Sequence, residues 1–151
     1  MEIPSFTFRL ERVKSLRERA EERAREELAH ELRLRLRGEA MLLEATNAAS
    51  AATQVGRDTV LAPGSAMDLI AAQAYIERSE RIRREAALDL DRRNAEVDAR
   101  RVALQAAARD RQVMDKLEER QRADHNAEWA RRSQNALDEI ALGVHRRGAA
   151  A

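Results

Sequence analysis

The chain lacks cysteine, and it has only two prolines, five glycines and 3% aromatic residues among its 151 residues. The lack of cysteine fits a reducing compartment, where disulfides are rare. The scarcity of aromatic residues argues against an ordinary globular core, because much of the 44% hydrophobic content is alanine, which buries little surface. The near-absence of proline argues against a disordered chain. Abundant alanine, glutamate, arginine and leucine with few breakers is typical of long helices and coiled coils.

An excess of one charge and long apolar runs are also missing. Lysine and arginine total 28, aspartate and glutamate total 27, and the two signs interleave along the chain. Nucleic-acid-binding proteins normally carry a basic excess on one face, so we expect no nucleic-acid partner. No apolar run approaches the roughly 20 residues that span a bilayer. The N-terminal residues show no signal-peptide pattern, and we therefore expect a cytoplasmic protein.

The residues that could carry chemistry are not grouped. The glycines are scattered, and none belongs to a phosphate-binding loop. His30, His125 and His145 are far apart in the sequence, so we expect no metal site. A two-helix chain also offers no cavity in which the pKa of a carboxylate could be shifted for catalysis. The sequence therefore predicts no enzymatic activity, no cofactor and no small-molecule ligand.

Breakers of helical structure gather in one place, between Gly56 and Gly64, where Pro63 also lies. Gly56 is suited to the left-handed conformation that ends many helices. Ser65 and Asp68 follow with the spacing of an N-terminal helix cap. The sequence predicts a helix over about 6–55, a turn over about 56–64 and a second helix over about 65–145.

Each predicted helix carries a stripe of apolar residues. In the first helix the stripe consists of Val13, Leu16, Ala20, Ala24, Leu28, Leu32, Leu36, Ala40 and Leu43. In the second helix a seven-residue frame, which slips further along the chain, holds Leu69, Ile76, Arg83, Leu90, Val97 and Leu104. The short link makes antiparallel docking the simplest way to cover both stripes. We predict an all-α fold, a single domain over residues 1–151, in which two long helices form an antiparallel coiled-coil hairpin and the second helix is longer.

The longer second helix is expected to leave an overhang. With the turn centred near Leu61, Phe6 lies opposite about residue 116, and the second helix continues for roughly 30 residues more. The apolar residues of this overhang are Trp129, Leu137, Ile140 and Val144. An uncovered apolar stripe marks a protein-binding surface. Two occupants remain open at this point, a different protein and a second copy of the chain.

A smaller candidate surface lies just after the turn. Tyr75, Arg78 and Ile82 could face outward there as a partner-binding patch at the hairpin tip. The simpler interpretation is that these residues and their apolar neighbours only seal the tip. Both interpretations stay open from the sequence.

The two ends of the sequence resemble a known family. The segment FTFRLERV at residues 6–13, followed by LRER at 16–19, resembles the start of the flagellar export protein FliJ family. The segments LEER at 117–120 and LDEIA at 137–141 resemble the closing motifs of that family. Length, long-helix content and the placing of the breakers agree over the whole chain. The chain departs from the family in its alanine-rich seams and its few aromatic residues.

The resemblance implies an antiparallel coiled coil, similar to the rotor stalk of rotary ATPases, that inserts into the ring of the export ATPase. It assigns to that end Phe6, Leu10, Arg12, Val13, Leu137, Asp138, Glu139 and Ile140, next to which the overhang adds Trp129. The implied partners are the export ATPase hexamer, the export-gate membrane protein and the chaperones of export substrates. The implied protein is a monomer in isolation and associates peripherally with the inner membrane at the export apparatus.

Two other functions stay open. A structural coiled-coil scaffold would self-associate through the overhang and form a stable dimer. A holdase chaperone with tentacle-like helices would normally be periplasmic and carry a signal sequence, and none is seen.

Overall fold

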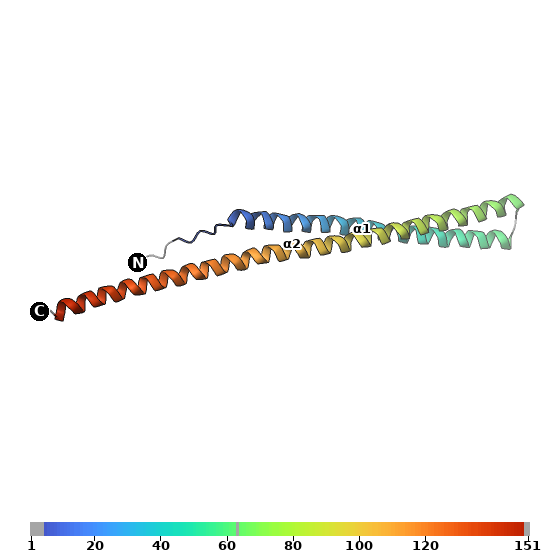
Figure 1. Cartoon of the computed structure of the whole chain (residues 1–151). Helices are drawn as coiled ribbons and strands as arrows, with labels where there is room; N and C mark the ends of the chain where they lie inside the picture. Colours follow the sequence, from blue (N-terminus) through green and yellow to red (C-terminus); the bar gives the residue numbers. More distant parts are fainter. Residues whose placement is uncertain (1–4, 63, 150–151) are drawn as a thin grey trace. The chain divides into compact units, whose positions relative to one another are not determined.

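The computed structural model describes residues 5–62 and 64–149, with side chains up to residue 146. Helix α1 spans Glu11–Leu61 and helix α2 spans Ala66–Ala149 (Figure 1). Within the described residues there is no strand, and no helix combines the length and apolar character that crossing a membrane requires. The predicted all-α fold is confirmed, because two long helices pack against each other as a helical hairpin and the second is longer.

The chain divides into two compact units. We call Met1–Glu21 with Ala107–Ala151 the terminal unit, and Glu22–Ala106, which contains the turn, the turn unit. In the turn unit the two helices run in opposite directions from the turn (Figure 1). In the terminal unit the start of the chain lies beside the later part of α2. The predicted single domain over residues 1–151 stays a prediction.

Helix α2 begins with the predicted cap. The Ser65 hydroxyl accepts a hydrogen bond from the Asp68 backbone N–H at 3.2 Å and donates one to the Asp68 carboxylate at 2.8 Å. Asp68 also places a negative charge in the first turn, where the helix dipole favours it. Both interactions satisfy or stabilise the exposed N–H groups of the first turn, and they place the start of α2 at Ala66, one residue from the predicted position.

Gly56 does not end α1, contrary to the prediction. The first helix spans Glu11–Leu61 rather than about 6–55, and no described residue has a positive φ. Gly56 is buried against α2, where an added Cβ atom would lie 2.5 Å from Ile76 Cδ1. Gly56 therefore lies at a contact between the two helices rather than in a turn. The chain therefore reverses only after Leu61.

In the turn unit, α1 faces α2 with many small residues. The positions that face α2 alternate in spacings of four and three, and they are Ala24, Leu28, Glu31, Arg35, Gly38, Leu42, Ala45, Ala49, Ala52 and Gly56. Leu32, Leu34, Thr53 and Thr59 are half-buried outside this alternation. This alternation is the heptad frame of a coiled coil. On α2, Ser79 and Val97 are buried. Small side chains let the two backbones approach closely, so close packing along a narrow seam holds this unit together.

The apolar stripe predicted for α1 is wrong at both ends. Its exposed members are Leu36, Ala40 and Leu43 in the turn unit and Val13, Leu16 and Ala20 in the terminal unit. Only Ala24, Leu28 and Leu32 are half-buried. The seam repeats about every 3.5 residues, whereas the predicted stripe repeats about every 3.75 residues, so the stripe drifts to the outside of the helix in both directions.

The seven-residue frame predicted for α2 is confirmed from Ile76 to Leu104, where every member is buried or half-buried. The predicted slip after Leu104 is wrong. The frame continues through Arg111, Glu118 and His125, which are all half-buried. These three polar residues contact residues at the start of the chain. Arg111 pairs with Glu21, Glu118 pairs with Lys14, and His125 contacts Phe6.

Candidate partner-binding site

The segment that precedes α1 lies against α2. Phe8 is buried, and the Phe6 ring meets the His125 ring edge-on with 5.7 Å between the ring centroids. The Arg122 guanidinium lies over the same Phe6 ring, 5.3 Å from its centroid. Edge-on aromatic contacts and cation–π contacts each contribute about 0.5–1 kcal/mol. These contacts therefore fasten the N-terminal segment to α2 within the terminal unit.

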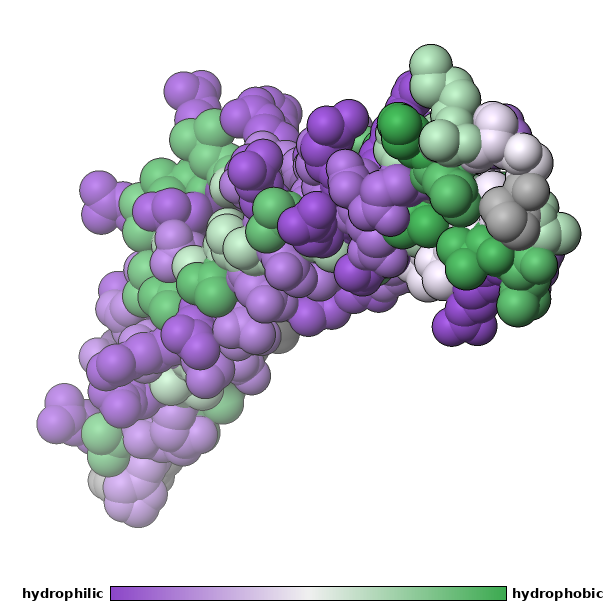
Figure 2. Space-filling model, turned by 90° about the vertical axis from the view of Figure 1, so that its right-hand side faces the viewer, coloured by the Kyte–Doolittle hydropathy of each residue, from purple (hydrophilic) through white to green (hydrophobic). Residues whose placement is uncertain are grey.

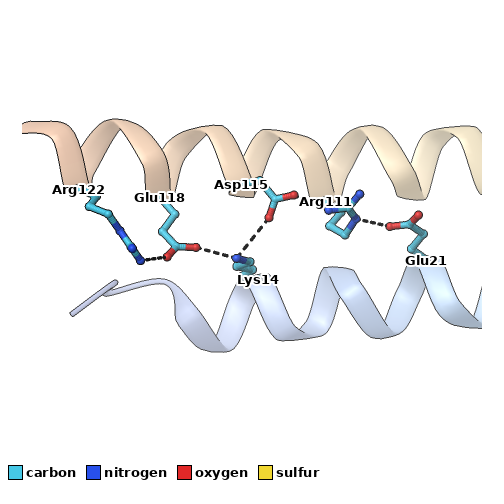
Figure 3. A network of polar contacts seen from close by, with 6 residues as sticks. All are labelled: Lys14, Glu21, Arg111, Asp115, Glu118 and Arg122. Atoms are coloured by element: carbon cyan, nitrogen blue, oxygen red, sulfur yellow. Dashed lines mark hydrogen bonds and ion pairs between the residues drawn. The ribbon is translucent and has the colours of Figure 1, made fainter. Parts of the chain in front are cut away.

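A polar network joins the first turns of α1 to α2 in the terminal unit (Figure 3). The Lys14 ammonium points between two carboxylates of α2, at 2.7 Å from Glu118 and 3.4 Å from Asp115. Arg122 donates a hydrogen bond of 2.8 Å to the other oxygen of Glu118. Lys14 and Glu118 are partly shielded from water, so their charge-assisted contact is stronger than a fully exposed pair.

A second part of the network is centred on Arg111. Its guanidinium donates to the buried carboxylate of Glu21 on α1 and to Asp115 on its own helix (Figure 3). Breaking such a pair would leave a buried charge without compensation, which is costly. Arg17 also reaches Asp110 at 2.9 Å, but both side chains are exposed, and such pairs contribute little.

The network shifts the protonation of its members. The hydrogen bond from Lys14 is the main reason that the pKa of Glu118 lies below its ordinary value. The same hydrogen bond is the main reason that the pKa of Lys14 lies above its ordinary value, while partial desolvation acts in the opposite direction. The hydrogen bond to Glu21 raises the pKa of Arg111. Each shift favours the charged forms and therefore the closed arrangement of the network.

The free energy by which the Lys14–Glu118 pair stabilises the folded chain should stay constant over a wide range of pH and fall at both ends of that range. Because the pKa of Glu118 is lowered by folding, its contribution is complete above the ordinary carboxylate pKa of about 4.3 and disappears as the pH falls through the lowered value. Because the pKa of Lys14 is raised, its contribution is complete below about 10.4 and disappears as the pH rises through the raised value. A double-mutant cycle with Lys14→Met and Glu118→Gln, measured by thermal unfolding across pH, tests this. A coupling that grows as the pH falls below about 4 would contradict it.

The overhang starts later along α2 than predicted. Phe6 meets His125 rather than a residue near 116, because α1 extends beyond Gly56 and shifts the alignment of the two helices. Measured from residue 5, where the described part of the chain begins, the overhang is residues 126–149 of α2. Within it the half-buried residues are Trp129, Ser133, Ala136 and Gly143, and this spacing no longer follows the heptad frame that ends at His125.

The overhang presents an exposed apolar face. Leu137, Ile140 and Val144 are exposed, and their spacing places them within one side of the helix, on the same side as Trp129. Leu142 is also exposed but lies about 200° around the helix from Ile140. We call Trp129, Leu137, Ile140 and Val144 the overhang face.

The structure places all of the residues predicted for the ATPase end in the terminal unit. Phe6 is half-buried, and the exposed members are Leu10, Arg12, Val13, Leu137, Asp138, Glu139 and Ile140. The Asp138 carboxylate accepts a hydrogen bond of 2.9 Å from Gln134, one turn earlier. Phe6 touches α2 at His125, one turn before Trp129. The two ends of the chain thus contribute exposed residues to one unit, and their role in binding stays a prediction.

The turn unit has an apolar groove between the ends of its two helices. It is lined by Thr53, Gly56, Arg57, Val60, Leu61, Leu69, Ala72, Gln73 and Ile76. Leu61 in this lining is exposed, as are Met67 and Ile70 at the start of α2, and Figure 2 shows hydrophobic side chains gathered at this end of the molecule. Between residues 47 and 76 the charged residues are Arg57, Asp58 and Asp68, in a chain that is 36% charged. The turn is therefore a second surface suited to a protein partner.

The predicted tip patch is accessible. Tyr75, Arg78 and Ile82 are all exposed, and their spacing of three and four residues places them on one face of α2. Tyr75 lies at the edge of a second groove, which it shares with Val55 and Thr59 of α1. Binding by these residues stays a prediction.

Sequence reasoning missed the polar network between the helices. From the sequence, the docking of the two helices is explained by their apolar stripes alone. A signal was available, because opposite charges occur at matching positions of the two antiparallel frames, such as Glu21 opposite Arg111 and Lys14 opposite Glu118. The correct alignment of the helices was needed to see it. The low charge of residues 47–76 is likewise a signal that the sequence contains.

A sequence profile of the family described as Flagellar FliJ protein matches residues 6–150. The chain belongs to the FliJ family. Searches of curated proteins and of solved structures each gave no match. Membership of the FliJ family makes the chain a coiled-coil protein related to flagellar export, and it confirms the resemblance seen at the two ends of the sequence.

Proposed function

We propose that this FliJ-family protein is a non-enzymatic accessory protein of flagellar type III export that binds the export ATPase hexamer through its terminal unit. The observation that supports this most directly is the overhang face on α2, with exposed Leu137, Ile140 and Val144. An apolar stripe on a single helix suits docking into a groove of another protein. Family membership gives the biological setting in which that partner is an export component.

The start of the chain supports the same proposal. Phe6 and Lys14 contact α2, and these contacts bring Leu10, Arg12 and Val13 into the same unit as the overhang face. In this proposal the ATPase ring contacts both ends of the chain, which together act as a stalk.

The turn unit supplies the second surface of the proposal. Tyr75, Arg78 and Ile82 and, on another side of α2, the apolar groove bind the export-gate membrane protein, and the same protein escorts the chaperones of export substrates. The protein is then cytoplasmic, and it associates peripherally with the inner membrane at the export apparatus through its partner. The low charge of residues 47–76 favours a protein contact over a solvated surface.

The direct test uses the full chain and the purified export ATPase of the same cell. We expect the chain to bind the ATPase hexamer and to raise its rate of ATP hydrolysis. A helical protein of similar length and charge without the overhang face serves as the control. Absence of both binding and stimulation would remove the proposal.

Self-association of the chain is the second candidate function, because the overhang face could equally be covered by a second copy. Light scattering separates the two. The export proposal expects a monomer in isolation, whereas a stable dimer at micromolar concentration would favour a structural scaffold.

A further inference from the structure

The first turns of α1 face α2 with charged residues. Lys14, Arg17 and Glu21 make ion pairs with α2 in the terminal unit, and we call these three the charged seam. Their spacing of three and four residues is that of ordinary core positions in a coiled coil, where apolar residues are the rule. The core positions are therefore occupied by the residue types least suited to burial.

An apolar seam lies next to the charged one. Val13, Leu16 and Ala20 each precede a member of the charged seam by one residue, and all three are exposed. The two seams have the same spacing, and they are separated by about 100° around the helix. We call Val13, Leu16 and Ala20 the apolar seam. The apolar seam, whose residues would ordinarily form the core of a coiled coil, therefore faces water.

The sequence of α1 explains why charged rather than apolar residues face α2 at its start. Ala45, Ala49 and Ala52 define a heptad frame in the turn unit, where their burial requires close helix contact. The same frame, continued toward the start of α1, falls on Lys14 and Glu21 rather than on apolar residues. A local preference that disagrees with the overall frame is a form of frustration, and it narrows the free-energy gap between the two arrangements.

We propose that the start of α1 is a two-state element that switches from the charged seam to the apolar seam by a helical step of one residue. The step turns α1 by about 100° and moves it by about 1.5 Å. Val13, Leu16 and Ala20 then face α2, while Lys14 and Glu21 turn toward water. On α2, Met114 is buried at the seam and supplies an apolar surface for the second arrangement.

Salt should favour the second arrangement. The pairs Lys14–Glu118 and Arg17–Asp110 have at least one partly exposed partner each, so added salt screens them. Burial of Leu16 does not depend on such attraction and is not weakened by salt. The population of the apolar seam therefore increases with ionic strength while both helices stay formed.

The test uses a single introduced thiol, because the chain has no cysteine of its own. The variant Ala20→Cys carries an exposed thiol in the charged-seam arrangement and a covered one after the step. We expect its alkylation rate to fall about fivefold between roughly 0.05 and 1 M NaCl, where the Debye length falls to about 3 Å. The variant Arg19→Cys, which lies on neither seam, corrects for the effect of salt on the reagent.

Two further substitutions separate a step from other changes. Leu16 and Val113 are each 62% exposed, and only Leu16 belongs to the apolar seam. In the Ala20→Cys background, Leu16→Gln should abolish the slowing by salt, whereas Val113→Gln should preserve it. Circular dichroism checks that helicity is unchanged in all variants.

Two results would overturn the proposal. An alkylation rate of Ala20→Cys that stays constant or rises with salt would mean that α1 keeps one seam or frays. Equal slowing in the Leu16→Gln variant would mean that Ala20 is covered by some other change, for example by association of two chains.

Discussion

Replacing Ile140 with aspartate is expected to weaken binding of the export ATPase about 100-fold, because residues at the centre of an interface often contribute about 2 kcal/mol or more. Ile140 lies in the middle of the overhang face, between Leu137 and Val144. In a docked complex its aspartate replacement would be desolvated without a partner, which adds to the lost apolar contact. A titration of the labelled chain with the ATPase hexamer measures the dissociation constant.

Leu142 provides a matched control for this experiment. Ile140 is 58% exposed and Leu142 is 57% exposed, so aspartate replaces a similarly exposed apolar residue on the same helix in each case. Leu142 lies on the opposite side of the helix from the overhang face. We expect Leu142→Asp to change the dissociation constant less than about threefold. Both variants should keep the helicity of the parent chain, since both positions face water.

The comparison of the two variants decides whether the overhang face is the surface that binds the ATPase. Equal weakening by Ile140→Asp and Leu142→Asp would point to the added charge rather than to a defined face. No weakening by Ile140→Asp, with binding of the parent chain intact, would move the ATPase contact away from the overhang face. The second result would leave the proposed export function standing and change only its site.

The hairpin could be predicted from the sequence because its determinants are local. Breakers cluster at one place in the chain, and Ser65 with Asp68 forms the cap that the spacing of the two residues indicates. The end of α1 could not be predicted in the same way. Gly56 has the residue type of a helix end, but it is buried against Ile76 within a helix that continues, and that contact exists only in the packed helices.

The seam of α1 could not be predicted because hydrophobicity favours burial of large apolar side chains over small ones. Leu36 and Leu43 are the more hydrophobic residues, yet Ala45 and Ala52 are buried and the leucines are not. Contact between two helices depends on how closely their backbones approach, and alanine and glycine permit the closest approach. The dispersion attraction between the two backbones along the whole seam then outweighs the burial of a few larger side chains.

The candidate site was predicted in part for a related reason. The overhang residues Leu137 and Ile140 were found because a longer second helix must extend past the first. The exact start of the overhang after His125 depends on how the start of the chain is aligned with α2, as the contact of Phe6 with His125 and the ion pair between Glu21 and Arg111 show. Long-range alignment is not encoded in the spacing within either helix.

The small-residue seam leads to the last expected result. Ala52 is 0% exposed, so a leucine at this position has no space unless the helices move apart. We expect Ala52→Leu to lower the free energy of unfolding by about 1–3 kcal/mol, as overpacked cores commonly do. Thermal unfolding followed by circular dichroism measures the loss. Leucine forms helices nearly as well as alanine, so the loss would report on packing rather than on helix propensity.

Ala51 serves as the matched control, because it is the preceding residue on the same helix and it is exposed. We expect Ala51→Leu to change the free energy of unfolding by less than about 0.5 kcal/mol. If Ala52→Leu were as stable as Ala51→Leu, the helices would separate at this level without cost. The heptad frame would then not be set by close packing in the turn unit, and the charged residues at the start of α1 would need another explanation for facing α2.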